Sequence, residues 1–192
     1  MKIARMLAPV HALGPGRRVA LWTQGCRRRC RGCISPELRP PGREEVPEPL
    51  LASIIRETAD REDCGGLTVS GGDPFDQPEA LLRLLRLLRD RFDDILVYTG
   101  WTMKEIRSGA CGREGILCLE EIDVLIDGPY EEERNFPDCV LRGSDNQLIQ
   151  FLSPGHREQY ETYMQNGRFL ESFAHTDTMI VVGIPDRGYR DG

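Results

Sequence analysis

Hydrophobic residues recur along the chain with two periods, and the two kinds of segment alternate. Short runs rich in Val, Ile, Leu and Thr, as in β-strands, lie at 18–24, 66–70, 95–100, 122–130, 146–152 and 178–184. The segments between them space their apolar residues three or four positions apart, as helices do, and predict helices at 49–62, 77–91, from 102 onward and at 155–172. The alternation predicts an α/β domain with a mainly parallel sheet.

Three short polar motifs follow strands of this predicted sheet. They are "GGDP" at 71–74, "YTGW" at 98–101 and "DGPY" at 127–130. Parallel strands joined by right-handed crossovers form a curved sheet, here expected to be a partial (β/α) barrel. Because the carboxyl ends of its strands lie at one rim, where ligands usually bind, we expect a site at that rim.

Length and composition describe an ordinary globular chain. With 192 residues, 40% hydrophobic and 29% charged, we expect a single domain over 1–192. The longest apolar runs, such as "MIVVGI", are too short to span a bilayer, and the first residues lack the apolar stretch of a signal peptide. We therefore expect a cytoplasmic protein with no membrane association.

Charge is distributed unevenly. Residues 1–43 contain ten Lys or Arg and one acidic residue, Glu37, although the whole chain has a net charge of −6. Such a segment attracts an anionic ligand or an acidic partner, or it is simply a solvated loop. Charge alone does not indicate a nucleic acid, and we expect no nucleic-acid partner.

Three of the seven cysteines, Cys26, Cys30 and Cys33, lie close together in "CRRRCRGC", directly after the first predicted strand. Clustered thiols in a reducing compartment more often bind metal than form disulfides, and thiolates select zinc, copper(I) or iron–sulfur clusters. A structural zinc site needs a fourth ligand, and His11 and Cys64 are distant in sequence. A 4Fe-4S cluster on three thiolates instead leaves one iron open. Cluster, zinc site and reactive thiols all remain possible at this point.

The cysteine motif is one of five that occur in a recognisable order. The segments 14–33, 68–74, 97–101, 122–130 and 141–147 together resemble the radical S-adenosylmethionine activating enzymes, above all those that activate anaerobic ribonucleotide reductase. Pyruvate formate-lyase activase is a more distant likeness. The resemblance ends near residue 150, so 151–192 is a C-terminal extension outside it.

This resemblance implies a 4Fe-4S cluster on the three cysteines, with S-adenosylmethionine bound to the fourth iron. In the family, an electron from the cluster cleaves S-adenosylmethionine and produces a 5′-deoxyadenosyl radical, and the activases use it to place a glycyl radical in a partner enzyme. The arginines at 27, 28, 29 and 31 flank the cluster and would attract an acidic electron donor such as a flavodoxin.

The resemblance also assigns individual residues to the cofactor. The residues carried over as contacts of S-adenosylmethionine are Gly32, Ser70, Gly71, Gly72, Asp73, Pro74, Tyr98, Thr99 and Asp127, and Arg142 is a candidate for binding a carboxylate or the partner. Each has a structural alternative: a tight turn for "GGDP", a helix cap for Asp127, core packing for Tyr98 and a salt bridge for Arg142. Leu13, Asp73 and Ser35 depart from the family pattern and leave the substrate open.

Two other functions fit parts of the sequence. A compact radical enzyme could act directly on a peptide or small metabolite, which would give residues 151–192 a role. A non-catalytic iron–sulfur or zinc protein would need the cysteines but would have no use for "GGDP". Cys64, Cys111, Cys118 and Cys139 match no short metal motif and are expected to be buried hydrophobic residues.

Overall fold

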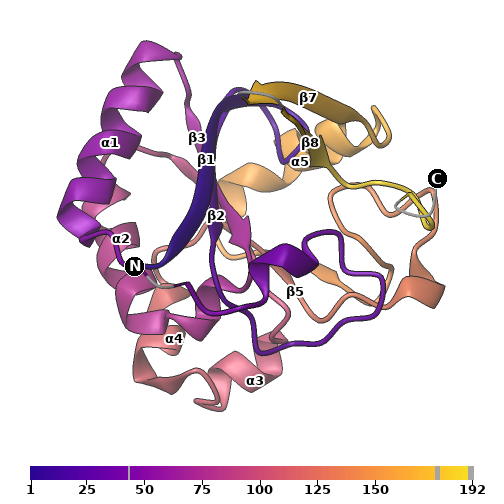
Figure 1. Ribbon diagram of the computed structural model, residues 1–192, viewed down its shortest axis with the longest axis horizontal. Coiled ribbons are helices and arrows are strands. Elements are labelled where there is room, and N and C mark those ends of the chain that lie inside the picture. The colour runs from indigo at the N-terminus through magenta and orange to yellow at the C-terminus, as the bar shows by residue number, and fades with distance from the viewer. Residues whose placement is uncertain (43, 176–177, 190–192) are drawn as a thin grey trace.

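The computed structural model describes residues 1–42, 44–175 and 178–189; Arg43 of the basic segment and parts of the C-terminal extension lie outside them. A six-stranded sheet is accompanied by a separate two-stranded hairpin (Figure 1). The large sheet contains β1 (Ile3–Val10), β2 (Arg18–Thr23), β3 (Gly66–Gly71), β4 (Asp94–Tyr98), β5 (Val124–Asp127) and β6 (Leu148–Phe151), and the hairpin contains β7 (Leu170–His175) and β8 (Thr178–Gly183). The α-helices are α1 (Glu48–Arg61), α2 (Pro78–Leu88), α3 (Met103–Arg107), α4 (Gly112–Cys118) and α5 (Arg157–Met164).

The order of strands in the large sheet follows the sequence, β1 to β6. The central strands β2 to β5 are parallel, and β1 and β6 pair antiparallel at the two edges. The predicted α/β class with a mainly parallel sheet is thus confirmed. Thr23 is in register with Gly71, so the loops that follow β2 and β3 begin side by side.

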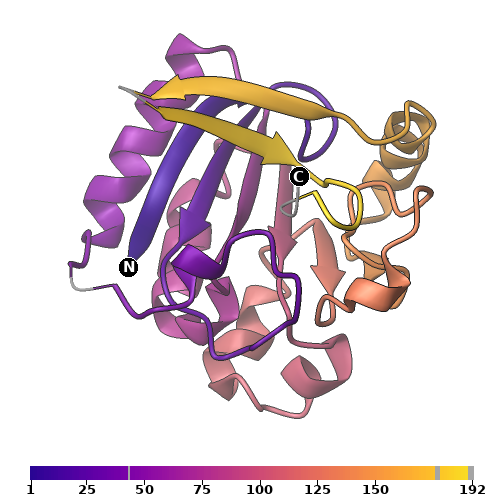
Figure 2. The same ribbon diagram turned by 45° about the vertical axis from the view of Figure 1, so that its right-hand side comes forward.

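Both faces of the sheet are covered. Helices α1, α2 and α4 lie on one face, and the β7–β8 hairpin with the loop after β2 lies across the other (Figure 2). Along β2, Val19 and Leu21 belong to the cluster under the helices, whereas Ala20 and Trp22 pack with Val182 of β8. Burial of both faces explains why β2 reads as an almost unbroken apolar run.

Several elements differ from the sequence prediction. Strand β1 was not predicted, because Arg5 and Pro9 interrupt its apolar pattern. Helix α4 was also not predicted. The helix expected over 155–172 ends at Met164, since Gly167 takes a φ of +74° that ends the helical path, and residues 170–175 form β7 instead. The strand expected at 178–184 forms, but it pairs with β7 outside the large sheet.

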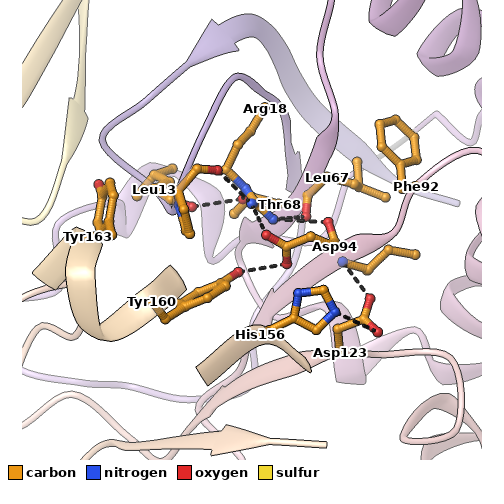
Figure 3. Close-up of polar contacts among 12 residues, drawn as sticks. Leu13, Arg18, Leu67, Thr68, Phe92, Asp94, Asp123, His156, Tyr160 and Tyr163 are labelled. Atoms are coloured by element: carbon orange, nitrogen blue, oxygen red, sulfur yellow. Dashed lines mark hydrogen bonds and ion pairs between the residues drawn. The ribbon is translucent and has the colours of Figure 1, made fainter. Parts of the chain in front are cut away.

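Helix α5 is anchored to the large sheet by buried polar groups (Figure 3). The hydroxyl of Tyr160 donates to Asp94 Oδ1 at 2.8 Å, and Arg18 Nη1 donates to Asp94 Oδ2 at 2.6 Å. The fully buried guanidinium of Arg18 also donates to the hydroxyl of Thr68 at 2.7 Å. The first helix after residue 150 therefore shares its core with the sheet. Among the described residues, none of the helices has the length and apolar character needed to cross a membrane.

Candidate functional site

A cavity of about 550 Å³ opens at the carboxyl ends of β2, β3 and β4. Its wall is formed by the loop after β2, the turns after β3 and β4, parts of the segment 128–147, and most residues of 180–189. This volume lies in the range of small-molecule sites, and the position is the one expected for ligands of parallel sheets. The predicted rim therefore carries a cavity.

All three clustered cysteines border this cavity. Cys26, Cys30 and Cys33 are half-buried and unpaired, and they lie on the single loop between β2 and α1. The loop is held by backbone contacts, and the guanidinium of Arg39 donates to the carbonyl oxygen of Cys30. Because the spacing is short, one loop presents three thiols to one space.

Burial shifts the acid–base behaviour of two of these thiols. It raises the pKa of the Cys26 thiol to about 11, although the hydrogen bond that this thiol donates to the carbonyl oxygen of Arg28 at 3.8 Å lowers the pKa. Burial also raises the pKa of Cys30, although Arg39 and Arg28 act in the opposite direction. A thiolate-binding metal group must displace these protons as it binds.

The donor set fits an iron–sulfur cluster better than a closed zinc site. Cys64 is buried among the helices, and His11 Nδ1 lies 2.8 Å from Glu171 Oε1; neither residue borders the cavity. In the part of the chain that the structure describes, no group of three or more His, Cys, Asp or Glu side chains is placed to hold a single metal ion. An iron–sulfur cluster does not require the side chains to converge on one ion, because each thiolate binds a separate iron.

The glycines of "GGDP" bring the turn after β3 against the cysteine loop. A Cβ on Gly72 would lie 2.2 Å from the carbonyl oxygen of Gly25, and Gly71 has a φ of +115°. The N–H groups of Gly72 and Asp73 donate to the carbonyl oxygens of Thr23 and Gly25, at 2.8 and 2.9 Å. Only glycine permits this close approach, directly before Cys26.

Asp73 joins this turn to the turn after β4. Its Oδ1 accepts hydrogen bonds from the Thr99 hydroxyl at 2.8 Å and the Phe75 N–H at 3.0 Å, and its Oδ2 accepts from the Gly100 N–H at 2.9 Å. Burial raises the pKa of the carboxyl group to about 7, against the effect of these three donors. The fully buried side chain therefore positions the cavity wall.

Ten of the residues assigned by resemblance meet at the cavity. They are Cys26, Cys30, Gly32, Cys33, Ser70, Gly71, Gly72, Asp73, Tyr98 and Thr99. The hydroxyl of Tyr98 is buried and has no hydrogen-bond partner among the described residues, and burial raises its pKa.

Three assigned residues do not border the cavity. Pro74 is buried at the start of a short 3-10 turn. Asp127 accepts hydrogen bonds from the N–H of Met103 at 2.7 Å and from the side-chain amide of Gln150 at 3.0 Å, so it caps the start of α3. Arg142 donates to the carbonyl oxygen of Gln147 at 3.1 Å and borders a separate hollow.

Other residues of the wall were not found from the sequence. Glu132 lies against Gly32, where a Cβ would be 2.7 Å from its Oε1. Gln147 organises the loop before β6, because its amide accepts from Gly143 N–H at 2.8 Å and donates to the carbonyl oxygen of Gly128 at 2.9 Å. The motif "RGSDNQ" ends in Gln147, but the sequence analysis singled out only Arg142 within it. No motif marks residues 180–189.

The basic residues beside the cysteines are largely paired within the chain. Arg27 lies 3.1 Å from Asp76, Arg28 lies 2.8 Å from Glu105, and Arg31 lies 3.2 Å from Glu132. These carboxylates reduce the positive field that the sequence predicts. Arg29 borders the cavity itself.

Comparison with known proteins gives a consistent picture. The family model described as "4Fe-4S single cluster domain" matches residues 12–150. The chain is 35% identical over 145 residues to the anaerobic ribonucleoside-triphosphate reductase-activating protein of Pasteurella multocida, covering 71% of this chain and 88% of that protein. The proteins of the same name from enterobacteria phage T4 (33% identical, 71% and 85% covered) and Escherichia coli K12 (29%, 72% and 91%) are similar over almost the same length.

Proposed function

Because the chain belongs to the family of anaerobic ribonucleoside-triphosphate reductase-activating proteins, we propose that it installs a glycyl radical in an anaerobic ribonucleotide reductase. The family resemblance drawn from the five motifs is confirmed. The expected cofactors, a 4Fe-4S cluster and S-adenosylmethionine, are those of this family of activating enzymes.

The observation that carries the proposal is the meeting of three free thiols and the "GGDP" turn at one cavity. Cys26, Cys30 and Cys33 would hold the cluster, and no fourth side chain from Cys64 or His11 competes for the open iron. The cluster, when bound, supplies the electron that cleaves the S–C5′ bond of S-adenosylmethionine to give methionine and a 5′-deoxyadenosyl radical.

The chain's own residues bind and orient the cosubstrate. Gly71 and Gly72 allow backbone to approach its methionine part, with Ser70 and Thr99 beside them on the same wall. Gly32 has no side chain, which leaves its backbone available to the adenine.

Four assigned residues hold the cavity wall in place, Asp73 from within the wall and the other three from outside it. Asp73 and Pro74 fix the turn after β3, and Asp127 fixes the start of α3. Arg142 holds the loop that carries Gln147. Tyr98 borders the site, and its hydroxyl is buried.

The proposal also covers the fold type, the domain organisation and the cellular location of the protein. Four parallel strands with their ligand cavity at the carboxyl ends support a partial (β/α) barrel of the radical S-adenosylmethionine type. The bond between Tyr160 and Asp94 supports one domain over 1–192, with 151–192 an integral extension. Free clustered thiols support a cytoplasmic location.

An acidic, flavodoxin-like protein is the proposed electron donor. Arg27, Arg29 and Arg31 remain exposed near the cysteines, even though two of them contact carboxylates. Replacing Arg29→Glu should slow reduction by such a donor and leave reduction by dithionite unchanged; equal effects on both reductants would remove the docking role.

A paired substitution tests the function. After anaerobic reconstitution, the unaltered protein should produce 5′-deoxyadenosine and a glycyl radical in the reductase, detected by electron paramagnetic resonance. Cys30→Ala should abolish both, whereas Cys64→Ala, a buried cysteine away from the cavity, should retain both.

Two outcomes would contradict the proposal. A reduced cluster that fails to cleave S-adenosylmethionine would exclude the radical reaction. Cleavage without a glycyl radical in the reductase would point instead to a compact enzyme that modifies a peptide or small metabolite directly.

A further inference from the structure

Strand β8 runs along the cavity with one edge free. Within the described residues its sheet contains two strands, so β7 pairs with one edge of β8 and no strand pairs with the other. Figure 2 shows β8 between β7 and the loop that carries the cysteines. The unpaired edge therefore faces the candidate site.

The lining of the cavity supports this orientation. Ile180, Val181, Val182 and Gly183 all border it, although neighbouring side chains of a strand point to opposite faces. Val182 is buried in the core beneath the hairpin, whereas 41% of Val181 is exposed. Residues from both faces can border one cavity when the edge of the strand, with its backbone N–H and C=O groups, is directed toward it.

The free edge lacks the features that usually prevent strand pairing. Natural edge strands are protected by charged residues, proline or bulges. The sequence of β8, "TMIVVG", contains no charged residue and no proline, and its pairing with β7 is in unbroken register. An uncharged edge of this kind favours pairing with an added strand.

Contacts from both strands fix the open end of the hairpin, where β7 begins and β8 ends, so this part of the edge is preformed. The carboxylate of Glu171 in β7 accepts the backbone N–H groups of His11 and Ala12, at 2.7 and 2.6 Å. Beyond β8, Arg168 donates to the carbonyl oxygen of Pro185 at 2.9 Å and to Asn135 Oδ1 at 2.8 Å. A rigid edge reduces the entropy lost when a peptide binds.

We propose that β8 is the docking strand for the protein substrate: the extended segment that carries the target glycine adds to its free edge through backbone hydrogen bonds. This inference rests on the proposed function, which requires a polypeptide to reach the cavity. Val181 and the exposed Ile34 also border the cavity, so apolar side chains beside the target glycine would fit there. Strand β8 lies beyond residue 150, outside the region that the family model matches.

Peptides with methylated backbone nitrogens test the hydrogen-bond pattern. The probe is a synthetic peptide of about nine residues centred on the target glycine of the reductase, titrated calorimetrically into the reconstituted protein with S-adenosylmethionine bound. Methylation at alternate residues should weaken binding by about tenfold, and methylation between them should have little effect, because alternate N–H groups of a strand face the same edge. No binding of the unmodified peptide, or losses without alternation, would overturn the inference.

Two substitutions on one face of β8 provide a matched control. Val181→Lys places a charge at the cavity and should weaken binding of the unmodified peptide by about tenfold. Met179→Lys changes a residue that is 69% exposed and does not border the cavity, and should leave binding unchanged. Equal effects of the two substitutions would contradict the docking strand.

These measurements separate the two proposals. Peptide affinity is measured without cleavage of S-adenosylmethionine. If methylation of alternate peptide nitrogens weakens binding but the protein never cleaves S-adenosylmethionine, the proposed function is wrong and the docking strand is retained. If the protein cleaves S-adenosylmethionine but methylation affects binding equally at all positions, the docking strand is wrong and the proposed function is retained.

Discussion

The hydroxyl of Thr99 donates a hydrogen bond of 2.8 Å to the buried carboxylate of Asp73, and this bond joins the turns that follow β3 and β4. Both turns border the cavity that the cysteines share. The shape of the candidate site therefore depends on a contact between residues that are 26 positions apart in the chain.

Replacing Thr99→Val should destabilise the protein and weaken binding of S-adenosylmethionine. Valine has the shape of threonine but no hydroxyl, so Asp73 Oδ1 loses a donor in a buried place, at a cost of about 1–3 kcal/mol. Urea unfolding and ligand titration measure the two effects. Ser108→Ala removes an exposed hydroxyl and should change stability by less than about 0.5 kcal/mol. Equal effects would argue against the role of the Thr99–Asp73 bond.

Gly72→Ala should displace the cysteine loop. The added Cβ would lie 2.2 Å from the carbonyl oxygen of Gly25, so the backbone before Cys26 must move. We expect lower iron content after reconstitution and a loss of stability of about 1–3 kcal/mol. At Gly65 a Cβ meets nothing within 4 Å, so Gly65→Ala should retain the iron content. Full iron content in Gly72→Ala would show that the loop does not need this close packing.

Tyr160→Phe should weaken the attachment of α5. The substitution removes the hydrogen bond to Asp94, while Arg18 still pairs with that carboxylate. We expect the free energy of unfolding to fall by about 1 kcal/mol, since the carboxylate of Asp94 keeps the hydrogen bond from Arg18 to its other oxygen. The substitution should increase the rate of hydrogen exchange more in residues 157–164 than in β4. A uniform increase throughout the chain would mean that α5 is not separately anchored.

Glu48 gives stability that depends on pH. Its carboxylate accepts hydrogen bonds from the amino group of Met1 at 2.6 Å and from Arg83 at 3.0 Å. Although burial alone raises the pKa, these partners lower it to about 2. A lowered pKa in the folded state stabilises the protein above the unfolded value of about 4.3, and this contribution is lost as the pH falls toward 2.

The variant Glu48→Gln measures this contribution. Its unfolding free energy should be lower than that of the unaltered protein by about 1 kcal/mol at pH 7, and the difference should shrink below pH 5. Comparing the two proteins at each pH cancels any common effect of acid on the cluster. Glu57→Gln, at an exposed position, is the control. A difference that stays constant with pH would contradict the ion pairs.

Local sequence predicted the elements whose burial is uniform. In α2 the leucines of the apolar stripe are fully buried, as helical spacing indicates: Leu81, Leu84, Leu85 and Leu88. The apolar runs of β2 to β5 form the parallel centre of the sheet. Strand β1 was not recognisable, because it is an edge strand whose apolar pattern is interrupted by Arg5 and Pro9. Helix α5 was predicted too long, since the pattern beyond Met164 is decided by pairing of β7 with β8.

The sequence by itself determined the cysteine spacing and the glycines of "GGDP", because both express local requirements: three thiols on one short loop, and backbone conformations that a side chain would prevent. Tertiary structure decided which distant residues join them. Asp127 and Arg142 hold turns outside the cavity, while Glu132 and β8 form its wall. Such contacts depend on where the chain returns after long connections, and no local pattern of side chains specifies that.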